Sequence, residues 1–126
     1  MNIPADLKYT KDHEWVKIEG NTVTIGITEF AAKELGDIVF IEVDTVGDEV
    51  ASGEVFGTIE AVKTVSDLFM PLTGTIDEFN EELEDSPESV NQDPYGKGWI
   101  IRASKEDGAD TSELIDADAY KALIGQ

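Results

Sequence analysis

Cysteine is absent from the 126-residue chain, and histidine occurs only once, at His13. The lack of cysteine excludes disulfide bonds, thiol catalysis and zinc–thiolate sites. One histidine is too few for a histidine-rich metal site, and no paired nucleophile and base stand out elsewhere in the chain. We therefore expect no metal ion and no catalytic residues, and interpret the protein as something other than an enzyme.

Basic residues are scarce as well, with 9 Lys and Arg against 28 Asp and Glu and a net charge of −19. Such a surface repels phosphate backbones and anionic lipids, so we expect neither nucleic acid nor a membrane as a partner. The acidity is typical of a soluble monomer, or of a protein that docks on basic patches of its partners.

Long hydrophobic runs are missing too, because no stretch approaches the roughly 18 apolar residues of a membrane span. The first residues, "MNIPADLKYTKDHEW", resemble neither a signal peptide nor a transit peptide. We expect a cytoplasmic protein, or a protein of the mitochondrial matrix if a presequence has been removed.

Alternation of apolar and polar residues predicts short β-strands. In "NTVTIGIT", Val23, Ile25 and Ile27 share one face, and the preceding Gly20-Asn21 pair predicts a hairpin turn. The segments "DIVFIEVD", "EVFGTIEA", "TGTIDEF" and "GWIIRAS" add further strands. In "DIVFIEVD" the expected inward face is made of Val39, Ile41 and Val43. In "EVFGTIEA" it is made of Val55, Gly57, Ile59 and Ala61. These patterns predict one mainly β domain over residues 1–126, a small sandwich or barrel.

Two short helices are expected beside the strands. "TEFAAKEL" follows the strand in "NTVTIGIT", with Thr28 as its N-cap and Gly36 as its stop. "DADAYKALIG" predicts a C-terminal helix capped by Asp116, with an apolar stripe made of Tyr120, Leu123 and Ile124. The acidic "NEELEDSPES" segment predicts a helical turn that runs into a loop.

Lys63 lies between two strand patterns, in "TIEAVKTVSDLF". If the flanking strands pair, residues 61–64 form the turn and Lys63 projects from one end of the domain. Such a lysine is either a solvated turn residue or a handle for acylation, which converts the ammonium into an amide and removes its charge.

The residues around Lys63 resemble those of the biotinyl and lipoyl carrier superfamily. The pattern "GTIEAVKTVSDLFMPLTGTI" is similar, more narrowly, to the lysine region of the glycine cleavage system H proteins. The blocks "YTKDHEWV", "GITEFAAKELGDIVFIEVD" and "SVNQDPYGKGWIIR" extend the resemblance over essentially the whole chain. One departure is Ala61, where the family more often has serine.

The resemblance implies a sandwich or flattened barrel of the hammerhead carrier type. It also implies lipoic acid in amide linkage on Lys63, attached by a lipoate ligase or an octanoyltransferase. The implied partners are glycine decarboxylase, which loads the aminomethyl group, aminomethyltransferase, which receives it, and dihydrolipoamide dehydrogenase, which reoxidises the arm. The family further implies a cleft for the loaded arm. By motif match its acidic side is Glu14 and Asp67, and Ile27, Ala31 and Leu35 are candidates for its apolar wall.

Other carriers fit the sequence less well. Lipoyl domains of 2-oxo acid dehydrogenases usually present Asp-Lys-Ala at the tip, and biotin carriers usually have methionines beside the lysine, whereas this chain has Val62-Lys63-Thr64. An acidic interaction module with an unmodified lysine, and a carrier that passes lipoyl groups to other proteins, stay open as alternatives.

Overall fold

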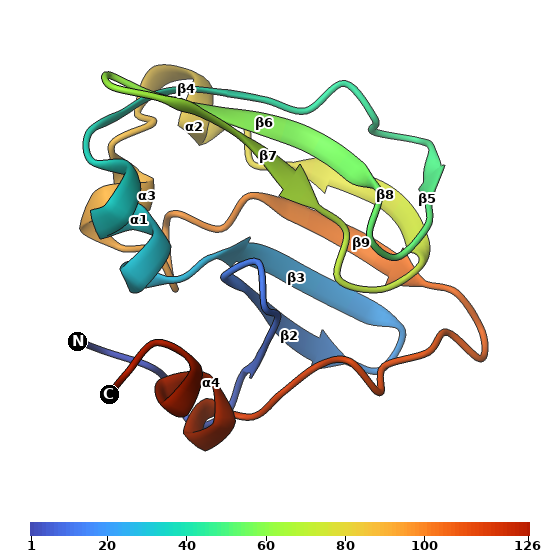
Figure 1. The fold of residues 1–126 in the computed structure, drawn as a ribbon. Helices are drawn as coiled ribbons and strands as arrows, with labels where there is room; N and C mark the ends of the chain where they lie inside the picture. The colour runs from blue at the N-terminus through green and yellow to red at the C-terminus, as the bar shows by residue number, and fades with distance from the viewer.

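The computed structural model describes the chain from Met1 to Gln126. Two antiparallel sheets form its centre, in agreement with the expected mainly β sandwich, and no barrel is closed (Figure 1). The larger sheet has the strand order β1-β2-β3-β9-β8-β5, and the smaller has the order β4-β6-β7. The strands are β1 Lys8–Tyr9, β2 Glu14–Glu19, β3 Thr22–Ile27, β4 Ile38–Glu42, β5 Glu49–Val50, β6 Val55–Ala61, β7 Val65–Phe69, β8 Gly74–Phe79 and β9 Ile101–Lys105.

Four short helices accompany the sheets: α1 Glu29–Leu35, α2 Glu82–Asp85, α3 Ser89–Gln92 and α4 Ala117–Leu123. The two expected caps are present, because Thr28 accepts a hydrogen bond from the amide of Ala31 and Asp116 accepts one from the amide of Ala119. The acidic segment forms α2 and then a short loop as expected, and α3 begins at its last residue, Ser89. None of the helices is long and apolar enough to cross a membrane.

The expected hairpin around Gly20-Asn21 joins β2 to β3, and Gly20 has the positive φ of 66° that favours glycine in this turn. Val23 and Ile25 are completely buried, and Ile27 is almost so. They belong to the main hydrophobic cluster, which fills the space between the two sheets. Helix α1 therefore begins directly after a strand whose position is fixed by core packing.

Two of the expected inward faces are wrong at one residue each. Val39 is 48% exposed, because the pairing of β4 with β6 shifts register between Ile38 and Phe40. Val55 is 43% exposed, because a similar shift lies between Val55 and Gly57, and Phe56 is buried in its place. A β-bulge inserts one residue and turns the following side chains to the other face, so simple alternation fails at these points.

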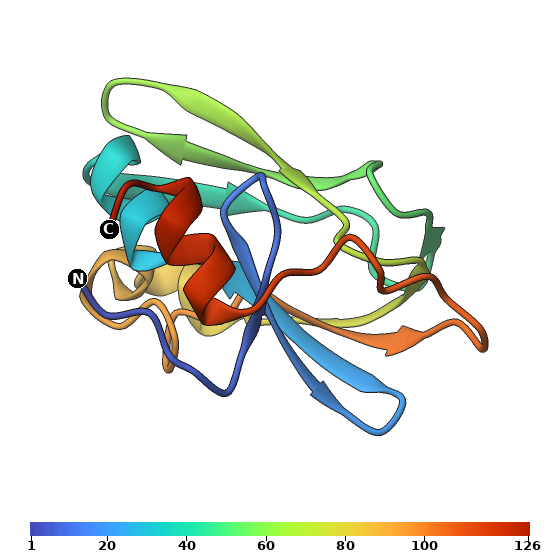
Figure 2. The same cartoon turned by 60° about the horizontal axis from the view of Figure 1, so that its bottom comes forward.

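A second, smaller hydrophobic cluster lies beneath α4 and joins the C-terminus to the first strands. Its buried members are Ile3, Leu7, Tyr9, Trp15, Ala117 and Tyr120. Of the expected apolar stripe, Tyr120 is a buried member of this cluster and Ile124 packs against it, but Leu123 is half-exposed, so the expected stripe is wrong at Leu123. In Figure 2, α4 lies at the same end of the molecule as α1 and the turn between β6 and β7.

Candidate functional site

Lys63 lies in the tight turn between β6 and β7, as expected from the sequence. The two strands pair up to Glu60 and Val65, and the amide of Ala61 donates to the carbonyl of Thr64 at 2.7 Å. Lys63 is exposed, and it takes part in neither of the two ion pairs of the chain, which are Lys33–Glu29 and Arg102–Glu78. The lysine amine is thus presented to solvent without a carboxylate that holds it.

The turn is anchored beside the C-terminal end of α1. The amide of Val62 donates to the carbonyl of Asp37 at 3.0 Å. Gly36 ends α1 with a φ of 80°, and a Cβ atom placed on it would lie 3.4 Å from Cε of Lys63. Glycine at this position therefore meets the backbone requirement of the helix end and leaves the lysine stem room to lie against it.

A cavity of about 380 Å³ opens between α1, the start of β2, the end of β3 and the edge strand β7. Its lining includes all five residues that the sequence proposed for the arm cleft, namely Glu14, Ile27, Ala31, Leu35 and Asp67. We refer to this space as the α1 cavity. The structure thus brings these five residues to one place.

Glu14 is the buried carboxylate of the α1 cavity, with 2% of its surface exposed. Oε1 accepts a hydrogen bond from the hydroxyl of Thr10 at 2.8 Å, and Oε2 accepts one from the amide of Phe69 at 3.2 Å. Burial raises the pKa of Glu14 to about 8, although both hydrogen bonds act in the opposite direction. A cationic group placed against this carboxylate would offset the cost of its ionisation.

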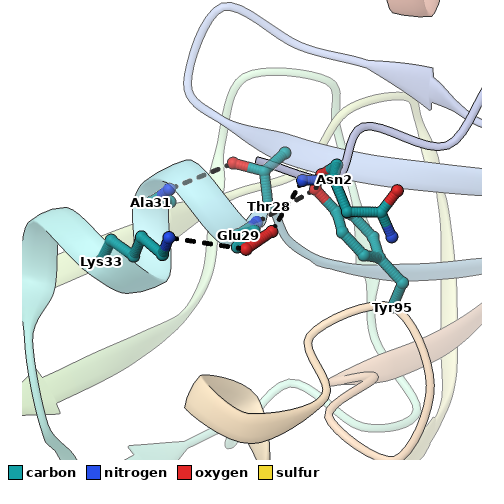
Figure 3. Close-up of polar contacts among 6 residues, drawn as sticks. All are labelled: Asn2, Thr28, Glu29, Ala31, Lys33 and Tyr95. Atoms are coloured by element: carbon teal, nitrogen blue, oxygen red, sulfur yellow. Dashed lines mark hydrogen bonds and ion pairs between the residues drawn. The ribbon is translucent and has the colours of Figure 1, made fainter.

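Helix α1, which forms one wall of the cavity, is held at both ends. At its start the Thr28 hydroxyl caps the helix, and the amide of Glu29 donates to the hydroxyl of Tyr95 at 3.0 Å (Figure 3). The backbone amide of Asn2 also donates to the Glu29 carboxylate, at 2.8 Å. At the other end the side-chain amide of Asn91 donates to the carbonyl of Gly36 at 2.9 Å. The wall is therefore fixed by residues far apart in the sequence.

Seven further residues of the lining were not assigned to the cleft from the sequence: Asp12, His13, Phe30, Glu34, Ile59, Ser66 and Leu68. His13 is half-buried, and its Nδ1 lies 2.8 Å from the hydroxyl of Tyr120. On α1, Glu34 lies three residues after the predicted Ala31, and Phe30 lies one turn before Glu34. Helical periodicity that starts from Ala31 could therefore have indicated both residues.

The α1 cavity therefore combines an apolar wall with four carboxylates, those of Asp12, Glu14, Glu34 and Asp67. Neither ion pair of the chain involves any of the four. Such a space suits a molecule with an apolar body and a cationic end, because none of the four acidic side chains is paired with a cation of the chain and a bound cation would favour the ionised form of Glu14.

The fold and the site together are a two-sheet β-sandwich that presents an exposed lysine in a tight antiparallel turn. The family model of the glycine cleavage H-protein matches residues 7–126. The chain belongs to this family.

Relatives of this family match the chain over nearly its full length. It is 56% identical to the glycine cleavage system H protein of Staphylococcus haemolyticus over 126 residues, which is 100% of both chains. It is 54% identical to that of Bacteroides thetaiotaomicron over 124 residues, or 98% of both. The crystal structure of a glycine cleavage system H protein from Mycobacterium marinum superimposes with a TM-score of 0.90 at 40% identity, covering 98% of this chain and 100% of that one.

Proposed function

We propose that this chain is a non-catalytic lipoyl carrier of the glycine cleavage system, with lipoic acid in amide linkage on Lys63. It takes the aminomethyl group from glycine decarboxylase and delivers it to aminomethyltransferase, and dihydrolipoamide dehydrogenase reoxidises it. The observation that supports this most directly is Lys63 itself, exposed in a tight turn without an ion-pair partner, in a chain that matches the family from residue 7 to its end.

The position of Lys63 suits a modifying enzyme and three further partners. A lipoate ligase or an octanoyltransferase needs an amine that it can reach, and no carboxylate holds this one. When bound, the lipoyl group supplies a disulfide that accepts the aminomethyl unit. A tether on a rigid turn raises the concentration of that disulfide at each partner's active site.

The residues of the α1 cavity suit the loaded arm. Glu14 and Asp67 would accept hydrogen bonds from its cationic amine, and Ile27, Ala31 and Leu35 would contact its apolar chain. Burial of Glu14 also keeps water away from the carboxylate that would contact the amine. In this proposal the chain protects the loaded unit, and the partner enzymes carry out the chemistry.

The charge of −19 favours docking on basic patches of the partners. Residues 1–126 would act as one domain and as a monomer. Because the relatives described above are bacterial, we place the protein in the cytoplasm.

The test is modification of Lys63 by a lipoate–protein ligase with lipoate and ATP, followed by intact-mass measurement and peptide mapping. We expect a single lipoyl addition on the peptide that contains Lys63, and none in Lys63→Arg. Lys33→Arg is the matched control, because Lys33 is also an exposed lysine close to the same end of the molecule. No addition to the folded wild type, or addition at another lysine, would contradict the proposal.

A further inference from the structure

A chain of three hydrogen bonds joins the C-terminal helix to the α1 cavity. The amide of Ala31 donates to Oγ1 of Thr28 at 3.1 Å, and Oγ1 lies 2.8 Å from the hydroxyl of Tyr120. The same hydroxyl lies 2.8 Å from Nδ1 of His13. Tyr120 is fully buried, and through its hydroxyl α4 contacts His13, which lines the cavity.

The hydrogen bond from the amide of Ala31 decides which groups donate in the other two hydrogen bonds. Because Oγ1 of Thr28 accepts a hydrogen bond from a backbone amide, the Thr28 hydroxyl is free to donate its own proton to the hydroxyl oxygen of Tyr120. The Tyr120 hydroxyl can then donate to Nδ1 of His13, and the proton of the neutral imidazole therefore lies on Nε2. This arrangement gives every hydroxyl proton an acceptor, whereas the reverse direction leaves the proton of Thr28 without one.

His13 is held in a conformation that needs such support. Its φ of 69° lies in the left-handed region, which is strained for a residue with a side chain. Its ring lies 4.9 Å from the ring of Phe30, and both residues line the cavity. His13 is also the residue before Glu14, so a movement of His13 would disturb the buried carboxylate.

We propose that the hydroxyl of Tyr120 is a positioning group for the α1 cavity, which holds the imidazole of His13 in the cavity wall. The C-terminal helix is thereby part of the device that retains the loaded arm. This inference rests on the proposed function for the arm itself, but the position of His13 does not depend on that function.

Tyr9 provides a matched control for Tyr120. Both tyrosines are fully buried in the smaller hydrophobic cluster, and their rings stack with centroids 4.8 Å apart. The hydroxyl of Tyr9 donates to the carbonyl of Pro4, and Tyr9 does not line the α1 cavity. Tyr120→Phe and Tyr9→Phe thus each remove one buried hydroxyl from the same cluster, and only the first removes a partner of His13.

The first measurement uses the unmodified chain and its single histidine, whose imidazole nitrogens give unambiguous NMR signals. In the wild type and in Tyr9→Phe we expect Nδ1 to be unprotonated and Nε2 to carry the proton. In Tyr120→Phe we expect a mixture of the two tautomers. A single Nε2–H tautomer in Tyr120→Phe would overturn the positioning of His13 by this hydroxyl.

The second measurement follows the loss of the aminomethyl unit from isolated, lipoylated and loaded protein. We expect Tyr120→Phe to release it about fivefold faster than the wild type, as the loss of one hydrogen bond of about 1 kcal/mol would give. Tyr9→Phe should release it at the wild-type rate. Equal acceleration in both variants would indicate general loosening and would overturn the proposal, as would an unchanged rate in Tyr120→Phe.

A third variant separates this inference from the function on which it rests. If Glu14→Ala releases the unit no faster than the wild type, then the cavity does not hold the loaded arm, and the assigned arm-binding role fails. The nitrogen signals would then decide by themselves whether Tyr120 positions His13. If Glu14→Ala accelerates the loss and Tyr120→Phe does not, then the cavity role stands and the role of Tyr120 is refuted.

Discussion

The turn that carries Lys63 and the helix α1 beside it are held very differently, although they lie at the same end of the molecule (Figure 2). Around the turn, Val62 is 75% exposed and Val65 is 60% exposed. Helix α1, by contrast, is tied by Thr28 and Tyr95 at its start and by Asn91 at its end.

In the proposed function, the difference corresponds to two tasks within one carrier. A handle that several enzymes must reach needs an exposed side chain on a firm base, and it gains nothing from buried contacts. A cavity that retains a reactive group needs walls that stay in place, so it depends on many distant residues. Changes near Lys63 should therefore alter modification and leave stability alone, whereas changes around α1 should alter both retention and stability.

The largest effect is expected for Glu14→Ala, which removes the buried carboxylate of the α1 cavity. Loss of a charge-assisted hydrogen bond to the amine should speed the release of the aminomethyl unit by about tenfold or more. The measurement is the decay of the isolated loaded protein, with Glu19→Ala, an exposed carboxylate at the other end of β2, as the control. Equal decay of the two variants would remove the distinction between the cavity and the surface.

Stability should also depend on pH through Glu14. Because burial raises its pKa to about 8 from 4.5, the folded protein keeps a proton that the unfolded chain has already released between these values. The free energy of unfolding should therefore fall as the pH rises from 4.5 through 8, with a contribution of at most about 1.4 kcal/mol per pH unit.

Urea unfolding of the wild type and Glu14→Gln over this range checks the prediction. The neighbouring carboxylates Asp12, Glu34 and Asp67 are present in both proteins, as is His13, so the difference between the two pH profiles isolates Glu14. Parallel profiles would show that this carboxylate titrates alike in the folded and unfolded states.

Thr28→Val should lower the free energy of unfolding by about 1–2 kcal/mol, because it removes the N-cap of α1 at nearly constant volume. Asp116→Ala, which removes the cap of α4, is the matched comparison and should cost about 1 kcal/mol. Thr28 also contacts the Tyr120 hydroxyl, so we expect its cost to be the larger of the two. Chemical denaturation measures both, and the opposite ranking would indicate that the bond to Tyr120 adds nothing.

The smallest effect is expected for Val62→Thr, next to Lys63 in the turn. The side chain is exposed, and the hydrogen bond to Asp37 is made by the backbone, so the free energy of unfolding should change by less than about 0.5 kcal/mol. The same denaturation experiment measures it. A loss of more than about 1 kcal/mol would show that the turn is held by its side chains after all.

Much of the fold could be predicted from local pattern, because the determining interactions lie close together in the chain. Gly20-Asn21 predicted the β2–β3 hairpin, and Thr28 and Gly36 predicted both ends of α1. The failures at Val39 and Val55 have one cause, the register shifts of β4 and β6. A bulge depends on how a strand meets its partner, and alternation within one strand does not report it.

The candidate site was predicted in part. The motif around Lys63 located the turn, and motif match brought forward Glu14, Asp67 and the three apolar residues that line the α1 cavity with them. Their proposed role in binding the arm stays a prediction. The position of His13 in the cavity wall could not be predicted, since nothing in the local sequence indicates a bond to Tyr120, 107 positions away.

The sequence by itself determined the strands and turns, the acidic charge and the lysine at the end of a hairpin, because alternation, capping and turn chemistry act over a few residues. Only the tertiary structure decided that Glu14 is buried, that α1 is held by residues 2, 91 and 95, and that α4 reaches the cavity through Tyr120. These features depend on which distant segments pack together, and that is settled by burial of the common core between the sheets.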